Sequence, residues 1–253
     1  MNKLLFAGLL LVFASSCKYD NGDKLRPDYY IKLNFTHKVG SAPFVPHTAY
    51  VNPFGENYVL DKFNYYFTNI EVLKNGSGIG AKENESYHLV EAGSPTSETF
   101  TISVPASDVN GISFFIGVDS ARNVSGAQTG ALDPLNGMFW TWNSGYIMVK
   151  MEGTSPLSTN PGNKFEYHIG GFKQPNNNVR KVTLSFPAGK KITIPENGTA
   201  ELFITCDINK WFNGVHDYKI ANNPFSIHTV IPVCAEVADN YATMFTVTDV
   251  INR

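Results

Sequence analysis

Alternation of apolar and polar residues recurs along most of this chain and predicts β-strands. In residues 30–37 every second residue from Ile31 to Phe35 is apolar, and His37 continues the same face. Similar runs lie at residues 63–67, 146–152, 164–169, 179–186 and 200–208, and residues 111–118 form a continuous apolar run. Asn-Gly turns and a polar loop at residues 153–163 separate many of these runs. The pattern predicts an all-β fold, an antiparallel β-sandwich.

One short helix is expected near the C-terminus. Pro232 suits a first helical turn. Apolar residues follow it at helical spacing, namely Cys234, Ala238, Tyr241, Ala242 and Phe245. No internal repeat and no shift in composition marks a second domain, so residues 29–253 are expected to form a single domain.

The first 28 residues have the pattern of a bacterial lipoprotein leader. Residues 1–17 combine a positive start, an apolar stretch too short to span a bilayer, and a small-residue cleavage site that ends at Cys17. A cysteine at this place is the usual acceptor of a lipid anchor; the alternative is an ordinary signal peptide with an incidental cysteine. Residues 18–28 are polar and are expected to be a tether. This pattern predicts a cell-envelope protein, periplasmic or on the outer membrane, held to the membrane only by its anchor.

Composition narrows the class of protein further. The net charge is −2, with no basic run, which argues against nucleic-acid binding. Charged residues make up only 17% of the chain, a value that suits a globular β-domain with many turns. Cys206 and Cys234 remain after leader removal. In an oxidising envelope they could form a disulfide; they could also be two buried thiols or soft metal ligands.

The histidines are the first candidates for chemistry. There are six, and none forms a short-range ligand pair, so any metal site must combine distant strands. By strand phase His37 points inward, either as a ligand or as a buried neutral imidazole. His168 lies opposite Phe165 and Tyr167 and in phase with Glu166, which predicts a surface side chain unless the second face of the sheet is also covered.

Residues 137–146 carry two tryptophans two positions apart. Trp140 and Trp142 would share one face of an extended strand with Met138. This arrangement suits core filling, and it also suits an indole held next to a reactive site. No hydrolase, nucleotide-binding or nucleophile–base motif is present, so an enzyme is not expected. Asp119 and Asp133 lie in a Gly- and Asn-rich loop without EF-hand spacing, and we expect them to cap turns.

Six segments, taken together and in order, resemble the MbnP-like family in the version found in Bacteroidetes-type lipoproteins. They are residues 35–40, 64–70, 116–120, 131–134, 137–146 and 167–171. The namesake of the family is a periplasmic protein that binds copper and methanobactin. The resemblance therefore implies a β-sandwich that binds copper through histidine and works in copper acquisition or handling.

The resemblance also implies roles for particular residues and partners. His37 and His168 are the candidate copper ligands, and Trp140 or Trp142 would be the tryptophan that a partner dihaem c-type peroxidase oxidises to kynurenine. Asn143 would orient the modified ring, and an outer-membrane transporter is a second expected partner. The alternative is a metal-independent surface lipoprotein that binds glycans or proteins. An exposed aromatic row, such as Trp211-Phe212 or Tyr29-Tyr30, would mark that alternative.

Overall fold

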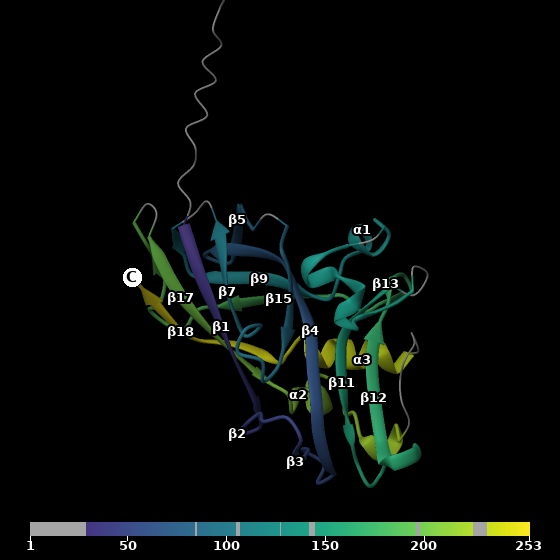
Figure 1. Ribbon diagram of the computed structural model, residues 1–253. Coiled ribbons are helices and arrows are strands. Elements are labelled where there is room, and N and C mark those ends of the chain that lie inside the picture. The colour runs from purple at the N-terminus through teal and green to yellow at the C-terminus, as the bar shows by residue number, and fades with distance from the viewer. Residues whose placement is uncertain are drawn as a thin grey trace, which may run out of the picture.

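Two β-sheets packed face to face form the body of the protein in this computed structural model (Figure 1). The structure describes residues 29–83, 85–104, 107–126, 128–141, 145–195, 198–224 and 232–253. Aromatic rings from both sheets meet in the interior. Phe35 of one sheet lies 6.5 Å from Tyr65 and 5.0 Å from Phe67 of the other, measured between ring centroids. The predicted all-β sandwich is confirmed.

The smaller sheet has five strands. They are β1 (Tyr29–Val39), β2 (Ala42–Pro43), β7 (Thr99–Val104), β17 (Thr199–Asp207) and β18 (Phe245–Asn252). β1 and β17 pair in parallel, whereas the other strand pairs of this sheet are antiparallel. Parallel neighbours need a long connection, and here the connection contains the whole of the second sheet.

The larger sheet has nine strands arranged around β4 (Asn57–Lys74). The others are β3 (Thr48–Val51), β5 (Ser77–Lys82), β6 (Tyr87–Glu91), β9 (Gly111–Ile116), β10 (Phe139–Thr141), β11 (Gly145–Thr154), β12 (Lys164–Gly170) and β15 (Arg180–Ser185). Two small ribbons join β8 (Asp108–Val109) to β16 (Ile192–Thr193) and β13 (Phe172–Lys173) to β14 (Asn176–Asn177).

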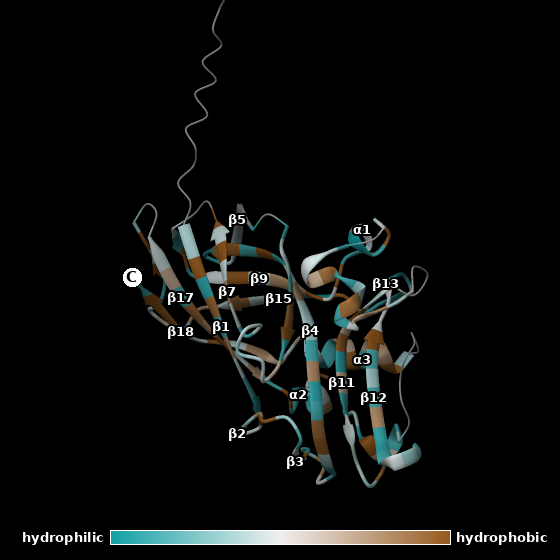
Figure 2. Cartoon of the chain, in the orientation of Figure 1, coloured by the Kyte–Doolittle hydropathy of each residue, from teal (hydrophilic) through white to brown (hydrophobic). Residues whose placement is uncertain are grey.

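Hydropathy along the strands explains the layering. β9 is apolar along most of its length and β12 alternates between polar and apolar residues (Figure 2). A strand that is apolar on both sides needs cover on both faces, whereas an alternating strand needs cover on one. Phe165, Tyr167 and Ile169 of β12 are fully buried, with the Tyr167 ring stacked on Trp211, while the residues between them face away.

Three α-helices and four 3₁₀ turns complete the described residues. They are α1 (Ser120–Asn123), η1 (Gly130–Leu132), η2 (Pro134–Asn136), η3 (Pro161–Asn163), α2 (Lys210–Asn213), η4 (Ile220–Asn222) and α3 (Pro232–Tyr241). The predicted C-terminal helix is confirmed as α3, but it ends at Tyr241, and Phe245 begins β18 instead. Among the described residues no helix is both long and apolar enough to cross a membrane.

The segment from α1 to η2 covers the outer face of the larger sheet, the face turned away from the smaller sheet. Tyr66 of β4 donates a hydrogen bond to the Ala131 carbonyl, and Tyr146 of β11 donates one to the Leu132 carbonyl. Asp119 caps α1 and Asp133 caps η2, as the sequence led us to expect. The candidate site lies on this same outer face, where β10, β11 and β12 meet.

Candidate functional site

Trp140 and His168 lie side by side on the outer face of the larger sheet. Their ring centroids are 6.5 Å apart, with the ring planes tilted by 40°. Trp140 comes from the three-residue strand β10, and His168 comes from β12, two strands away across β11. The structure thus brings together two residues that the sequence presents in separate motifs.

A glycine makes room for the indole. Gly170 follows His168 by two positions on β12, and a Cβ atom there would overlap Cζ3 of Trp140. Where β12 passes beneath the tryptophan, a register shift between Ile147 and Val149 of β11 adjusts the pairing of the two strands. Trp140 is partly buried and packs against the hydrophobic core.

Glu152 anchors the His168 ring. Its carboxylate lies 2.8 Å from His168 Nε2, 3.3 Å from Lys62 Nζ and 3.8 Å from Lys150 Nζ. The hydrogen bond with His168 is the largest of several effects that lower the pKa of Glu152 to about 2, and both lysines act in the same direction against the effect of burial. Glu152 is therefore a carboxylate at any physiological pH and fixes the orientation of the imidazole.

Lys150 forms a hydrogen bond at the beginning of residues 137–146, here called the tryptophan segment. It is only 8% exposed, and its Nζ donates a hydrogen bond to the Gly137 carbonyl, at the turn before β10. Burial lowers the pKa of Lys150, while the neighbouring Glu152 carboxylate acts in the opposite direction. A lysine in this environment joins the turn to the same carboxylate that holds His168.

Asn123 fastens the other end of the segment. This fully buried side chain accepts a hydrogen bond from the Tyr146 amide at 2.9 Å and donates one to the Val118 carbonyl at 2.6 Å. Gly145 has a φ of +75°, and a Cβ there would overlap Asn123 Oδ1. Both ends of the tryptophan segment are thus tied to the sheet. Sequence reasoning missed Asn123, Lys150 and Glu152, because none belongs to a recognisable motif.

His37 occupies a different place, in the interior between the two sheets. Its Nδ1 lies 2.7 Å from Glu98 Oε1, and its Nε2 lies 3.1 Å from the Tyr65 hydroxyl. The residue is 4% exposed, which confirms the inward orientation predicted from strand phase. Its two ring nitrogens contact side chains, Glu98 and Tyr65, and not backbone carbonyls.

His37 and His168 face opposite sides of the larger sheet. Tyr65, which contacts His37, is the register partner of Val149 on β11. His168 is the register partner of the next residue, Lys150, so its side chain points to the other face. The structure does not bring the two predicted ligands together. Within the described ranges, no group of three or more His, Cys, Asp or Glu side chains is arranged to hold a metal ion.

Comparison with known proteins places the chain in a family. The MbnP family model matches residues 28–229, which is most of the chain. The chain belongs to the MbnP family. A solved structure of MbnP from Methylosinus trichosporium has the same fold, with a TM-score of 0.55 and 13% sequence identity, covering 89% of this chain and 99% of that one. No curated protein sequence matches.

Family membership confirms the resemblance found from the sequence, but several residue predictions lie outside the described part of this MbnP-family chain. Cys17 falls in residues 1–28, and Trp142 and Asn143 fall in residues 142–144. Their proposed roles in lipidation and beside the metal remain predictions.

The cysteine and aromatic-row predictions can be compared with the structure. Cys206 of β17 and Cys234 of α3 are both buried and are thiols, so the disulfide considered from the sequence is not formed. Burial raises the pKa of the Cys206 thiol well above its ordinary value, as expected for an inert core thiol. Trp211 and Phe212 are fully buried in the core, so they cannot form an exposed aromatic row.

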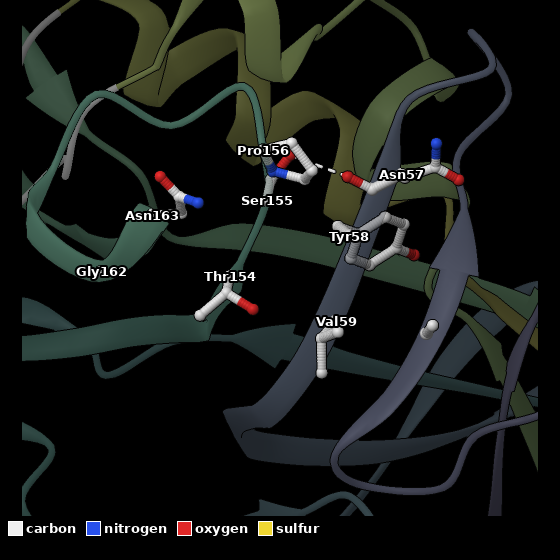
Figure 3. Close-up of a pocket in the computed structure, with 9 residues that line it drawn as sticks. Asn57, Tyr58, Val59, Thr154, Ser155, Pro156, Gly162 and Asn163 are labelled. Carbon is white, nitrogen blue, oxygen red and sulfur yellow. Dashed lines mark hydrogen bonds between the residues drawn. The ribbon is translucent and has the colours of Figure 1, made fainter.

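A surface pocket of about 330 Å³ lies elsewhere, where the β11–β12 loop meets β3 and β4 (Figure 3). Its walls are neutral and include Asn57, Thr154, Ser155 and Asn163. Ser155 already donates a hydrogen bond to the Asn57 carbonyl at 2.7 Å, which closes one side. No histidine or carboxylate lines this pocket, so its chemistry does not suit a metal.

Proposed function

We propose that this MbnP-family protein binds copper on the outer face of its larger sheet and serves in copper acquisition or handling in the cell envelope. His168 would be a ligand, and Trp140 would be the tryptophan that is oxidised to kynurenine next to the metal. The observation that supports the proposal is the 6.5 Å approach of the Trp140 and His168 rings within a segment tied down at both ends.

The donor chemistry fits copper. Neutral imidazole is a favoured copper ligand. Ligating histidines usually give one ring nitrogen to a carboxylate that orients the ring, and Glu152 takes that part at Nε2 of His168. Oxidation of Trp140 to kynurenine would replace a donor-only indole with a ketone and an aniline, which add acceptor atoms at the same place.

His37 is not part of this copper site in the proposal. Both of its ring nitrogens are held, by Glu98 and Tyr65, on the opposite face of the sheet. The two histidines predicted from the sequence as one ligand pair are therefore proposed to have separate roles. Substituting each histidine separately therefore tests the proposal.

The test is copper retention after dialysis of the chain from residue 18 onward. We expect copper to be retained in the unmodified chain, to be lost in His168→Ala, and to be retained in His37→Ala once that variant is shown to be folded. His216→Ala is the matched control, because His216 also pairs with a carboxylate, Asp239, at 3.2 Å. Full retention in His168→Ala would contradict the proposed site.

The kynurenine is tested separately by mass spectrometry of the peptide that contains both Trp140 and Trp142. Fragment ions that place the oxidation on Trp140 support the proposal, and oxidation confined to Trp142 would contradict this assignment. We further propose that the protein is not itself an enzyme, that it is anchored through Cys17, and that its partners are a dihaem c-type peroxidase and an outer-membrane transporter. Family membership and the lipoprotein-like leader support these proposals.

A further inference from the structure

The buried tyrosines of this protein differ in what their hydroxyl groups contact. Four donate to backbone carbonyls, namely Tyr66 to Ala131, Tyr146 to Leu132, Tyr167 to Asn223 and Tyr241 to Asn178. The Tyr58 hydroxyl has no hydrogen-bond partner in the described part of the chain, and the Tyr218 hydroxyl interacts with that of Tyr167. Tyr65 alone among these seven described tyrosines has its hydroxyl directed at an imidazole, Nε2 of His37. A carbonyl cannot take up a proton, whereas a neutral imidazole can.

When the His37 imidazole is neutral, its contacts determine which nitrogen is the acceptor. The Glu98 carboxylate accepts a hydrogen bond from Nδ1 at 2.7 Å, so the Nε2 lone pair faces the Tyr65 hydroxyl at 3.1 Å. Glu98 is held in turn by the Gly93 amide at 2.8 Å. Burial acts to raise the pKa of Glu98, but hydrogen bonds from His37 and Gly93 outweigh it, so the carboxylate stays charged beside the imidazole.

Tyr65 does not lose its proton by simple ionisation, because burial raises its pKa well above the ordinary value. Loss of an electron is different, since a phenol that has lost an electron becomes a strong acid and must pass its proton to a base within hydrogen-bond reach. His37 is such a base, and Glu98 offsets the positive charge that the imidazole then carries.

We propose that Tyr65 is a redox-active tyrosine that traps one-electron oxidising equivalents in the core. One electron leaves the Tyr65 ring for a strong one-electron oxidant, such as a high-valent metal–oxo centre, which is reduced by one electron. In the same step the O–H bond of Tyr65 breaks and a new N–H bond forms at His37 Nε2. The products are a neutral tyrosyl radical and an imidazolium that faces Glu98.

A chain of buried rings connects Tyr65 to β12. Tyr65 lies 5.8 Å from Phe63, Phe63 lies 6.3 Å from Trp211, and Trp211 lies 6.2 Å from Tyr167, measured between centroids. Tyr167 directly precedes His168 on β12, on the opposite face from the Trp140 site. Tyr167 donates to a carbonyl, and Trp211 Nε1 has no partner among the described residues. The radical is therefore most stable at Tyr65. This inference does not depend on copper binding.

The test is flash oxidation of the metal-free protein by photogenerated ruthenium(III) tris-bipyridine, followed by electron paramagnetic resonance and transient absorbance. We expect a long-lived tyrosyl signal that is lost in Tyr65→Phe and kept in Tyr167→Phe, the matched control. His37→Gln retains a polar side chain but removes the base. We expect it to slow radical formation by about a hundredfold, the contribution typical of a positioned proton acceptor.

Two results would overturn the proposal: an undiminished long-lived signal in Tyr65→Phe, or an unchanged rate of formation in His37→Gln. Circular dichroism establishes that each variant is folded. If either variant does not fold, the wild-type rate in deuterated water decides, because proton transfer to His37 in the same step requires a slower rate there. An equal rate in the two solvents would overturn the proposal without any substitution.

Discussion

Replacing Glu152 with glutamine removes the charge that organises the candidate copper site. The carboxylate accepts a hydrogen bond from His168 at 2.8 Å and faces Lys62 and Lys150 at 3.3 and 3.8 Å. Glutamine has nearly the same shape, so the substitution tests the charge with little change in packing. It leaves the two lysine ammonium groups and the histidine without the negative charge that they share.

The magnitude follows from the pKa of Glu152. The folded protein lowers this pKa from 4.5 to about 2, and each pKa unit is worth about 1.4 kcal/mol, so the carboxylate contributes about 3 kcal/mol to the free energy of unfolding. Because the folded-state value is depressed, the contribution is complete above about pH 4.5 and is lost as the pH falls toward 2. The side chain is 24% exposed, so solvent screening makes about 3 kcal/mol an upper figure.

The assay is urea unfolding of wild type and Glu152→Gln at pH 7 and at a series of lower pH values. We expect the difference in unfolding free energy to be largest at pH 7 and to shrink steadily below pH 4.5. Glu236→Gln is the control, because Glu236 is exposed on α3 and gives the same change of charge. A difference that is independent of pH would refute the electrostatic argument and indicate a loss of packing instead.

Three further predictions follow from the geometry around the site. Gly170→Ala places a Cβ against the Trp140 indole, so we expect a change in tryptophan fluorescence and a stability loss of about 1 kcal/mol, because the partly buried indole can shift; an unchanged spectrum would contradict the contact. Asp119→Ala removes the cap of α1, and we expect a loss of about 1 kcal/mol or more in urea unfolding. A reducing agent should leave the midpoint of thermal unfolding unchanged, since Cys206 and Cys234 are thiols; a fall in the midpoint would indicate a disulfide.

Strand phase predicted the orientation of His37 correctly and the surroundings of His168 incompletely. The alternation from Ile31 to His37 placed the His37 imidazole inside, because β1 has one buried face and its period is unambiguous. The same argument placed His168 on the surface, yet its side chain is only 12% exposed. The Trp140 ring and the Glu152 carboxylate lie beside it, and the sequence could not show that β10, β11 and β12 meet at this place.

The pairing of His37 with His168 failed for a different reason. Alternation shows which residues share a face within one strand. It does not show whether residues on two distant strands lie on the same face of a sheet. That depends on register, here the pairing of Tyr65 with Val149 and of Lys150 with His168. For the same reason the sequence could not decide whether Cys206 and Cys234 form a disulfide, because it gives no distance between a residue on β17 and one on α3.

The two histidines show how similar local chemistry serves different ends in one fold. Each imidazole is held by a glutamate, Glu98 in the core and Glu152 on the outer face, at nearly equal distances of 2.7 and 2.8 Å. What differs is the aromatic neighbour. A tyrosine hydroxyl beside His37 can exchange a proton with the ring, whereas the indole beside His168 lies 6.5 Å away, centroid to centroid, with the planes tilted. His37→Gln is therefore expected to change radical chemistry without copper loss, and His168→Ala to do the reverse. A variant of either histidine that changed both properties would show that the two faces of the sheet are coupled.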